Sequence, residues 1–445
     1  MAYPFRERKA HLTFGDLVGD LRELVCGFPD KRTGRNVKYR MEDVAMSAFS
    51  VFFTQSPSFL AHHTALTASE GSSNVRAWFG TRMIPTDNHI RDVLDAVPPQ
   101  EVFPMFERVF DALHERGQLQ AFRAFDEQLL IALDGTQYHR SSCISCERCS
   151  VTKHSNGQID YAHSVVTPVI VAPGHHRVLP LEPELITPQD GHQKQDCENA
   201  AAKRWISRYA ERYRELGVTL LGDDLYSHQP LCEHALAAGL NFIFVCKPSS
   251  HPILYEWLDG LPATSGVHTL IRERRHGKRR ERDTYRFAHK LPIRDGDDAL
   301  QVNWCELTTT DRDGKILYGN AFISNHAIHA GKVAAIVQAG RARWKVENEN
   351  NNTLKNQGYH LTHNFGHGQQ HLSALLLTLN LLAFLLHTVL DMMDAKCRLI
   401  RAKLPSRQMF FQHLQALICY WRFESFDALL DFMMRGLRID VPDTS

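Results

Sequence analysis

Three acidic residues stand where apolar sequence gives way to polar sequence. Asp134 ends the apolar run LLIALD, Asp223 ends the run VTLLGD, and Glu347 lies in the polar helical pattern RWKVENENNNTLKN. A buried strand tolerates a carboxylate at its end, because the acid can coordinate a cation there. Two carboxylates brought together repel each other unless a metal neutralises them. The trio therefore predicts a site for two Mg²⁺ or Mn²⁺ ions, which suits in-line phosphoryl transfer.

A cysteine cluster follows the first of these acids at a spacing typical of zinc ligands. The segment CISCERC forms overlapping C-x2-C pairs, His154 and His163 follow it, and thiolates with imidazoles suit Zn²⁺. Such pairs also arise by chance in a chain of ten cysteines, so chance spacing stays open as the alternative. A zinc ion would staple the hairpin after Asp134. The candidate structural zinc ligands are Cys143, Cys146, Cys149, His154 and Cys197.

Three further histidines, His363, His367 and His371, have the spacing of one helix face and could form a metal-binding face. Gly366 and Gly368 lie between them and weaken a helix. We therefore expect a polar loop here.

Positive charge is concentrated in two segments, although the whole chain is balanced. Lys and Arg total 51 against 50 Asp and Glu, which argues against a strongly basic nucleic-acid binder. Residues 31–40 nevertheless hold five basic side chains, and residues 272–282 hold seven. Either run could be an ordinary solvated face. If the second run contacts a nucleic-acid backbone instead, the candidate residues are Arg274, Arg275, Arg279 and Arg280.

Periodicity predicts a helical start followed by a mixed α/β core. Three strand patterns precede two helix and strand repeats, and this β-β-β-α-β-α-β order corresponds to a ribonuclease H-like arrangement with an antiparallel start and a parallel continuation. Its first and fourth strands are neighbours, so Asp134 and Asp223 would meet. The predicted domains are a helical DNA-binding domain (1–125), the first part of the core (126–249), a β-rich insertion with two hairpins (250–328), the second part of the core with the catalytic helix (329–395) and a helical C-terminal region (396–445).

One apolar segment is long enough to cross a membrane. Residues 372–390 read LSALLLTLNLLAFLLHTVL, but five polar residues interrupt the run, and neither a second span nor an aromatic belt accompanies it. We therefore expect a buried core helix and no membrane partner. The N-terminal stretch MAYPFRERKAHLTF lacks the apolar centre of a secretory signal, which favours a cytoplasmic protein.

Several segments resemble bacterial insertion-sequence transposases of the DDE type, whose catalytic core is ribonuclease H-like. They are IALDGTQYH, LLGDDLYSHQPL with the strand NFIFVCKP after it, and RWKVENENNNTLKNQGYHL. The resemblance implies that Asp134, Asp223 and Glu347 are the catalytic metal ligands. It also places the second acid three residues before an aromatic, which selects Asp223, three before Tyr226, over Asp224.

The last segment is similar to a related group with a Tyr, Arg, Glu and Lys signature, from which it departs at two positions. Arg343 has the expected place four residues before Glu347. Gly340 stands at the Tyr position and Leu354 at the Lys position, with Lys355 one residue further on. The residues that the resemblance implies in contacts with the phosphates and bases of the transposon ends are Arg343, Lys355, Tyr359 and His360.

The resemblance implies a DNA transposase that cleaves and transfers strands. Its partners would be double-stranded DNA, at the terminal inverted repeats and at the target, and a second copy of the chain in a homodimeric complex. Two other function classes stay open. A catalytically inactive DNA-binding protein derived from a transposase would keep the basic segments, whereas a zinc-dependent hydrolase would centre on the cysteines and histidines.

Overall fold

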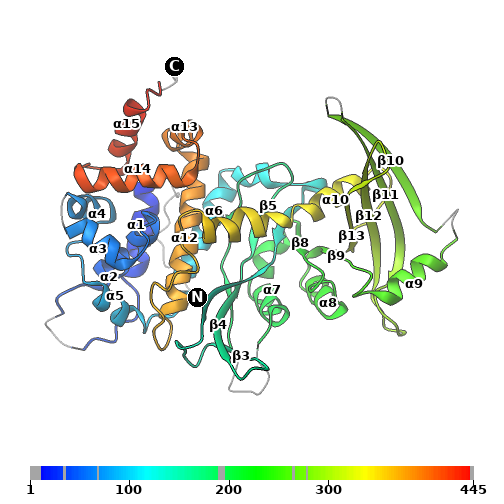
Figure 1. Ribbon diagram of the computed structural model, residues 1–445, viewed down its shortest axis with the longest axis horizontal. Helices are drawn as coiled ribbons and strands as arrows, with labels where there is room; N and C mark the ends of the chain where they lie inside the picture. The colour runs from blue at the N-terminus through cyan, green and yellow to red at the C-terminus, as the bar shows by residue number, and fades with distance from the viewer. Residues whose placement is uncertain are drawn as a thin grey trace.

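The computed structural model shows a mixed α/β protein with helices at both ends of the chain. A helical body lies at one end of the elongated molecule, and a large sheet extends away from it (Figure 1). The α/β class, the helical N-terminal region and the helical C-terminus expected from the sequence are confirmed. The absence of a secretory signal was inferred from the N-terminal stretch, and most of that stretch, residues 1–11, lies outside the described part. The structure describes residues 12–33, 37–67, 70–188, 196–262, 266–276 and 279–440.

Helices from the two ends of the chain pack into one helical body. Its elements are α1 (Phe14–Val25), α2 (Met41–Phe53), α3 (Phe59–Thr67), α4 (Gly71–Phe79), α5 (Asp87–Leu94), η1 (Pro99–Val102), α6 (Phe103–Glu115), α12 (Leu372–Met393), α13 (Ala395–Lys403), α14 (Arg407–Tyr420) and α15 (Phe426–Gly436). Phe14 stacks on Phe426 with ring centroids 4.4 Å apart. The Asn74 side chain donates hydrogen bonds to the carbonyls of Ile418 and Trp421. The two ends of the chain therefore share one core.

Local sequence explains where several of these helices begin. Thr13, Ser406 and Ser425 accept hydrogen bonds from backbone N–H groups in the first turns of α1, α14 and α15. Such caps satisfy donors that have no partner inside the helix. In α1, Leu17 and Leu21 lie on one face at helical spacing, and both are buried.

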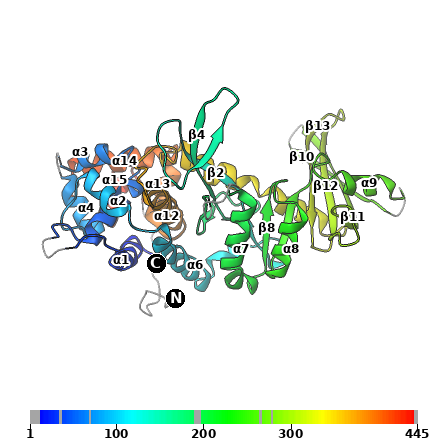
Figure 2. The same cartoon turned by 90° about the horizontal axis from the view of Figure 1, so that it is seen from below.

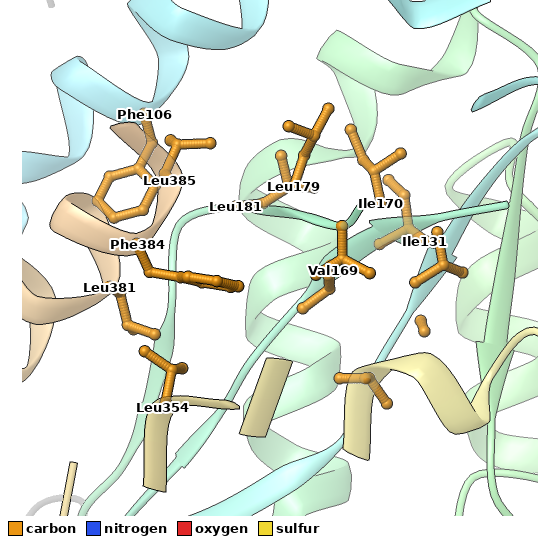
Figure 3. Close-up of a cluster of buried hydrophobic side chains, with 14 of the residues drawn as sticks. Phe106, Ile131, Val169, Ile170, Leu179, Leu181, Leu354, Leu381, Phe384 and Leu385 are labelled. Atoms are coloured by element: carbon orange, nitrogen blue, oxygen red, sulfur yellow. The ribbon is translucent and has the colours of Figure 1, made fainter. Parts of the chain in front are cut away.

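Helix α12 is the buried axis of the helical body. It is the one helix in the described part of the chain that is long and apolar enough to cross a membrane, yet 94% of its most apolar window is buried. Asn380 donates to the Tyr359 carbonyl, and His387 bonds the Tyr359 hydroxyl and the Phe53 carbonyl. The expected core helix is confirmed. Figure 3 shows where helices meet the central sheet, with Phe106, Leu381, Phe384 and Leu385 on the helical side and Ile131, Val169, Ile170, Leu179 and Leu181 on the sheet side.

Nine strands form the central sheet in the order β10-β11-β12-β13-β9-β8-β1-β5-β6. They are β1 (Leu129–Ala132), β5 (Val169–Val171), β6 (Leu179–Pro180), β8 (Val218–Gly222), β9 (Asn241–Val245), β10 (His268–His276), β11 (Arg279–Pro292), β12 (Gln301–Asp311) and β13 (Ile316–Ser324). Strand β1 pairs antiparallel with β5 and parallel with β8, which in turn pairs parallel with β9. The expected antiparallel start and parallel continuation are confirmed.

The apolar segments predicted as three long strands are each divided between two sheets. Strand β1 ends before Asp134 and β2 (Gly135–Ser141) begins after it, while β4 (Ile159–Val166) and β5 are separated by Thr167 and Pro168. Proline has no N–H for the ladder, and a backbone bond from Thr167 N to Asp134 O closes the corner. Strands β2 and β4 form a smaller sheet with β3 (Ser150–Lys153) and β7 (Glu184–Ile186). Figure 2 shows this smaller sheet standing out from the molecule.

The β-rich insertion continues the central sheet. Hairpins β10–β11 and β12–β13 form as expected, and β13 pairs antiparallel with β9. Gly277, between β10 and β11 in the sequence, lies outside the described residues. Gly314 in the second turn has φ +83°, a conformation that glycine adopts without strain. The helices that accompany the sheet are α7 (Glu198–Arg214), α8 (Gln229–Ala237), α9 (Pro252–Gly260), α10 (Val333–Arg341), the π-helix η4 (Val346–Asn351) and α11 (Asn352–Asn356).

Candidate active site and metal centre

Asp134 and Asp223 lie at the same edge of the sheet. They follow the adjacent parallel strands β1 and β8, in which Ala132 pairs with Leu221. Burial raises the pKa of Asp134 to about 7, and the nearby carboxylates of Glu347, Glu198 and Asp223 add to this rise. The structure therefore brings Asp134 within electrostatic range of the other two predicted acids and of Glu198, although the carboxylate oxygens do not all lie within 4.8 Å of one another.

Glu347 reaches this cluster from a π-helix. The segment Val346–Asn351 contains an extra residue per turn, a feature that is frequent at functional sites. The Arg343 guanidinium contacts Glu347 Oε1 at 2.5 Å, and 46% of the Glu347 side chain is exposed. Arg343, expected to contact DNA, thus orients a catalytic candidate in this structure.

Asn351, one turn after Glu347, holds the Asp134 carboxylate. Its amide donates to Asp134 Oδ2 at 2.8 Å, and its own oxygen accepts from Thr167 Oγ1 at 3.1 Å. Asn350 donates to the same oxygen at 3.0 Å. These partners fix which end of the amide faces Asp134. Asn350 and Asn351 are buried, so neither is placed to contact DNA bases.

Glu198, at the start of α7, is a fourth acid that sequence reasoning missed. Tyr226 donates its hydroxyl proton to Glu198 Oε2 at 3.2 Å, and burial raises the pKa of Glu198. A Cβ atom at Gly135 would overlap the Glu198 carboxylate. The glycine directly after Asp134 therefore makes room for Glu198 beside the other acids.

Asp224 makes hydrogen bonds with the neighbouring loop. Its carboxylate accepts from Lys247 N at 2.8 Å and from the Ser250 hydroxyl. Asp223 accepts from Leu225 N at 2.8 Å within its own turn. Asp223 is the member of the pair whose charge helps to raise the pKa of Asp134.

The structure corrects the expectation for Tyr359. Only 2% of this residue is exposed, and its hydroxyl bonds His387 Nδ1 at 2.8 Å and Arg407 Nη1 at 2.9 Å. Because an aromatic ring inside the core cannot stack on a base, Tyr359 packs the helical body and does not contact DNA from the surface. Lys355 and His360 are half-buried near it.

Packing explains both departures from the transposase signature. A Cβ atom at Gly340 would lie 2.7 Å from the Phe322 ring, so α10 has no room for a tyrosine there. Leu354, at the position of the expected lysine, is fully buried. The next residue, Lys355, is the one that reaches toward solvent.

The basic hairpin β10–β11 forms the outer edge of the sheet. Arg274 is paired with Asp283 at 2.6 Å and with Glu281 at 3.4 Å. Arg275 and Arg280 are exposed and stand opposite each other in the register. The side chain of Arg279 lies outside the described part. Charge on an edge strand also prevents pairing with other chains, so the structure is compatible with both interpretations of this segment.

The cysteine cluster forms a different ligand set from the one predicted. Cys146 and Cys149 lie with His163 and His367, and one ligand atom of each is within 4.8 Å of all the others. Among the described residues, this is the only group of three or more His, Cys, Asp or Glu residues so close together. The set could hold a metal ion such as zinc, as expected, but with two different ligands.

Three predicted zinc ligands lie elsewhere. Cys143 is exposed, and Cys197 is the exposed residue preceding α7. His154 bonds Asp160 at 2.8 Å. The segment around His363 and His371 is a polar loop, as expected, yet His367 of this loop contacts Cys149. Sequence spacing could not reveal this contact, because 218 positions separate the two residues.

No family model matches this chain, and no curated protein matches it either. The assignment of function therefore depends on the geometry of the site and on the short segments described above.

Proposed function

We propose that the protein is a DNA transposase that binds the terminal inverted repeats of an insertion sequence and catalyses strand cleavage and strand transfer. The observation that carries the proposal is that Asp134 and Asp223 follow adjacent parallel strands and that burial and the charge of Glu347, on the π-helix, raise the pKa of Asp134. The order β6-β5-β1-β8-β9, antiparallel and then parallel, supports a ribonuclease H-like core. The segments that resemble DDE transposases are the same ones that supply the three acids.

The site has the donor atoms for Mg²⁺ or Mn²⁺, which prefer carboxylate oxygens. Two such ions would supply an electrostatic clamp on the attacking and leaving oxygens of a phosphodiester. The chain's own residues prepare this site: Asn351 orients Asp134, and Arg343 orients Glu347. Because burial raises the pKa of Asp134 to about 7, its carboxyl would give up a proton to solvent when a cation binds near neutral pH.

The proposed partner is double-stranded DNA, bound by two copies of the chain. Arg275 and Arg280 on the exposed face of β10–β11 support contacts with a phosphate backbone. Arg274 contributes less, since Asp283 already neutralises it. Lys355 and His360 are half-buried beside the segment that carries Glu347, which suits contacts close to the cleaved bond.

The two alternatives are less well supported. A zinc hydrolase needs an open coordination position for water, whereas the group around Cys149 offers four protein ligands and is closed. An inactive DNA-binding protein would have no use for several acids held together, since their mutual repulsion costs stability when no cation is bound.

A cleavage assay on a duplex that carries the element's ends tests the proposal. The wild-type protein should cut it with Mg²⁺ or Mn²⁺ and not with EDTA. Asp134→Ala should abolish cleavage while leaving DNA binding largely intact, because affinity depends on Lys and Arg at phosphates. Full cleavage by that variant would falsify the assignment of the acids. Binding without any cleavage by the wild type would favour the inactive DNA-binding protein.

A further inference from the structure

We propose that Cys146, Cys149, His163 and His367 bind one structural zinc ion that clasps the smaller sheet to the loop preceding α12. Their ligand atoms are separated by 3.8 Å (Cys146 Sγ to Cys149 Sγ), 3.6 Å (Cys146 Sγ to His163 Nε2), 3.5 Å (Cys149 Sγ to His163 Nε2) and 3.7 Å (Cys149 Sγ to His367 Nε2).

These separations correspond to four of the six edges of a tetrahedron of zinc ligands, and the other two edges are within 4.8 Å. Zn–S bonds of about 2.3 Å and Zn–N bonds of about 2.0–2.1 Å at tetrahedral angles give S···S edges of about 3.8 Å and S···N edges of about 3.6 Å. The four distances in the protein, 3.5–3.8 Å, match these edges closely. Two thiolates and two imidazoles also select zinc over the hard cations that suit the carboxylate site. Four protein ligands leave no position for a reacting water, so the role is structural.

The proposed zinc site joins two parts of the chain that are far apart in the sequence. Cys146, Cys149 and His163 belong to the smaller sheet and its β2–β3 loop, whereas His367 lies in the loop before α12. This loop is fixed to the helical body, because Asp95 accepts hydrogen bonds from the backbone N–H groups of residues 369–372. A zinc ion would therefore hold the smaller sheet against the helical body.

The proposed zinc site also affects the carboxylate site, although the two sites share no residue. Strand β2 begins directly after Asp134 and pairs with β4, which carries His163. On the other side, His367 belongs to the polar segment that follows Glu347. Zinc thus links the two chain segments that supply these acids, and we expect it to stabilise their mutual position.

Metal analysis of the purified full-length protein tests the clasp. One zinc ion per chain should survive dialysis without chelator. Cobalt(II) substitution should give thiolate charge-transfer absorption and the visible bands of a tetrahedral site. His367→Ala and Cys149→Ser should lose the metal, whereas the matched controls Cys143→Ser and His154→Ala should keep it. Removing zinc should lower the melting temperature by on the order of 5–10 °C.

A further variant covers the case in which the ligand substitutions fail to fold. His367→Cys keeps four ligands and should retain zinc, while its cobalt(II) form should gain charge-transfer intensity from a third thiolate. Absence of zinc from the folded wild type overturns the proposal, and so does loss of zinc from Cys143→Ser with retention in His367→Ala. Zinc content is measured without DNA, so this result is independent of the proposed transposase activity.

Discussion

Asn351 donates its side-chain N–H to the carboxylate of Asp134 at 2.8 Å, across the gap between the π-helix and the first strand of the sheet. The same π-helix carries Glu347, so one amide sets the distance between two of the proposed metal ligands. Thr167 and Asn350 hold the amide from its other end. Asn351 is thus a positioning residue, since it acts on the reaction through Asp134.

Asn351→Ala should lower cleavage by about 10–100-fold, the usual effect of losing a group that orients a metal ligand. The loss should be smaller at high Mg²⁺, because the main defect is in metal affinity. Cleavage rates measured over a Mg²⁺ series, with DNA binding measured in parallel, check this. Asn348→Ala is the control, because Asn348 is exposed on the same π-helix. Equal effects of the two substitutions would contradict the positioning role.

Asp223→Asn should eliminate cleavage in Mg²⁺, whereas Asp224→Asn should leave a substantial fraction. The charge of Asp223 helps to raise the pKa of Asp134. Asp224 instead accepts hydrogen bonds from Lys247 N and Ser250 in the loop after β9. The second substitution should therefore act mainly on stability. A side-by-side cleavage assay with a thermal melt of each variant separates these effects. The reverse order of activities would move the second ligand to Asp224.

Replacing Arg275 and Arg280 with Ala should weaken DNA binding and flatten its salt dependence. Each lost phosphate contact reduces the slope of log K against log salt by about 1. Binding isotherms at several salt concentrations give this slope. Arg435→Ala, an exposed arginine on α15 at the other end of the molecule, should leave it unchanged. An unaltered slope in the double variant would show that β10–β11 is an ordinary solvated edge that does not contact DNA.

The stability of the protein should fall with rising pH because of Glu182. Burial raises the pKa of this residue from 4.5 to about 8. The folded state therefore holds a proton that the unfolded state has already released. The contribution of Glu182 to the free energy of unfolding is complete below about pH 4.5 and is lost as the pH rises through about 8.

The slope from Glu182 should reach at most about 1.4 kcal/mol per pH unit. Glu182→Gln keeps the shape and cannot ionise, so its free energy of unfolding should vary less over this pH range. Denaturant unfolding at several pH values measures the difference. Glu256→Gln, at an exposed position of α9, is the control. An identical pH profile for wild type and Glu182→Gln would show that Glu182 does not control this dependence.

Helices and strands could be predicted from local sequence, whereas contacts between residues far apart in the sequence could not. Strands β1 and β8 are short, continuous apolar runs, so their ends, and with them Asp134 and Asp223, could be located from residue type alone. The corner after β1 could not, because β1 and β2 are nearly continuous in the sequence and only their pairing with other strands divides them between two sheets.

The site roles of Glu198 and His367 were missed because they depend on contacts between residues that are far apart in the sequence. Glu198 reads as an ordinary acid in the first turn of a helix, where the helix dipole favours negative charge. His367 is separated in sequence from every cysteine of its cluster. Only the fold brings Glu198 to Gly135 and His367 to Cys149.

The shared helical body has a consequence for biosynthesis. Helix α2 packs against α12 as well as against α1, α4 and α5, so part of its apolar surface has no cover until the ribosome has released residues up to 393. The strands of the central sheet are all made before then. A nascent chain stalled before α12 should thus show a protected sheet and protease-sensitive amino-terminal helices. Translation that stops early would then yield a chain without a folded amino-terminal region.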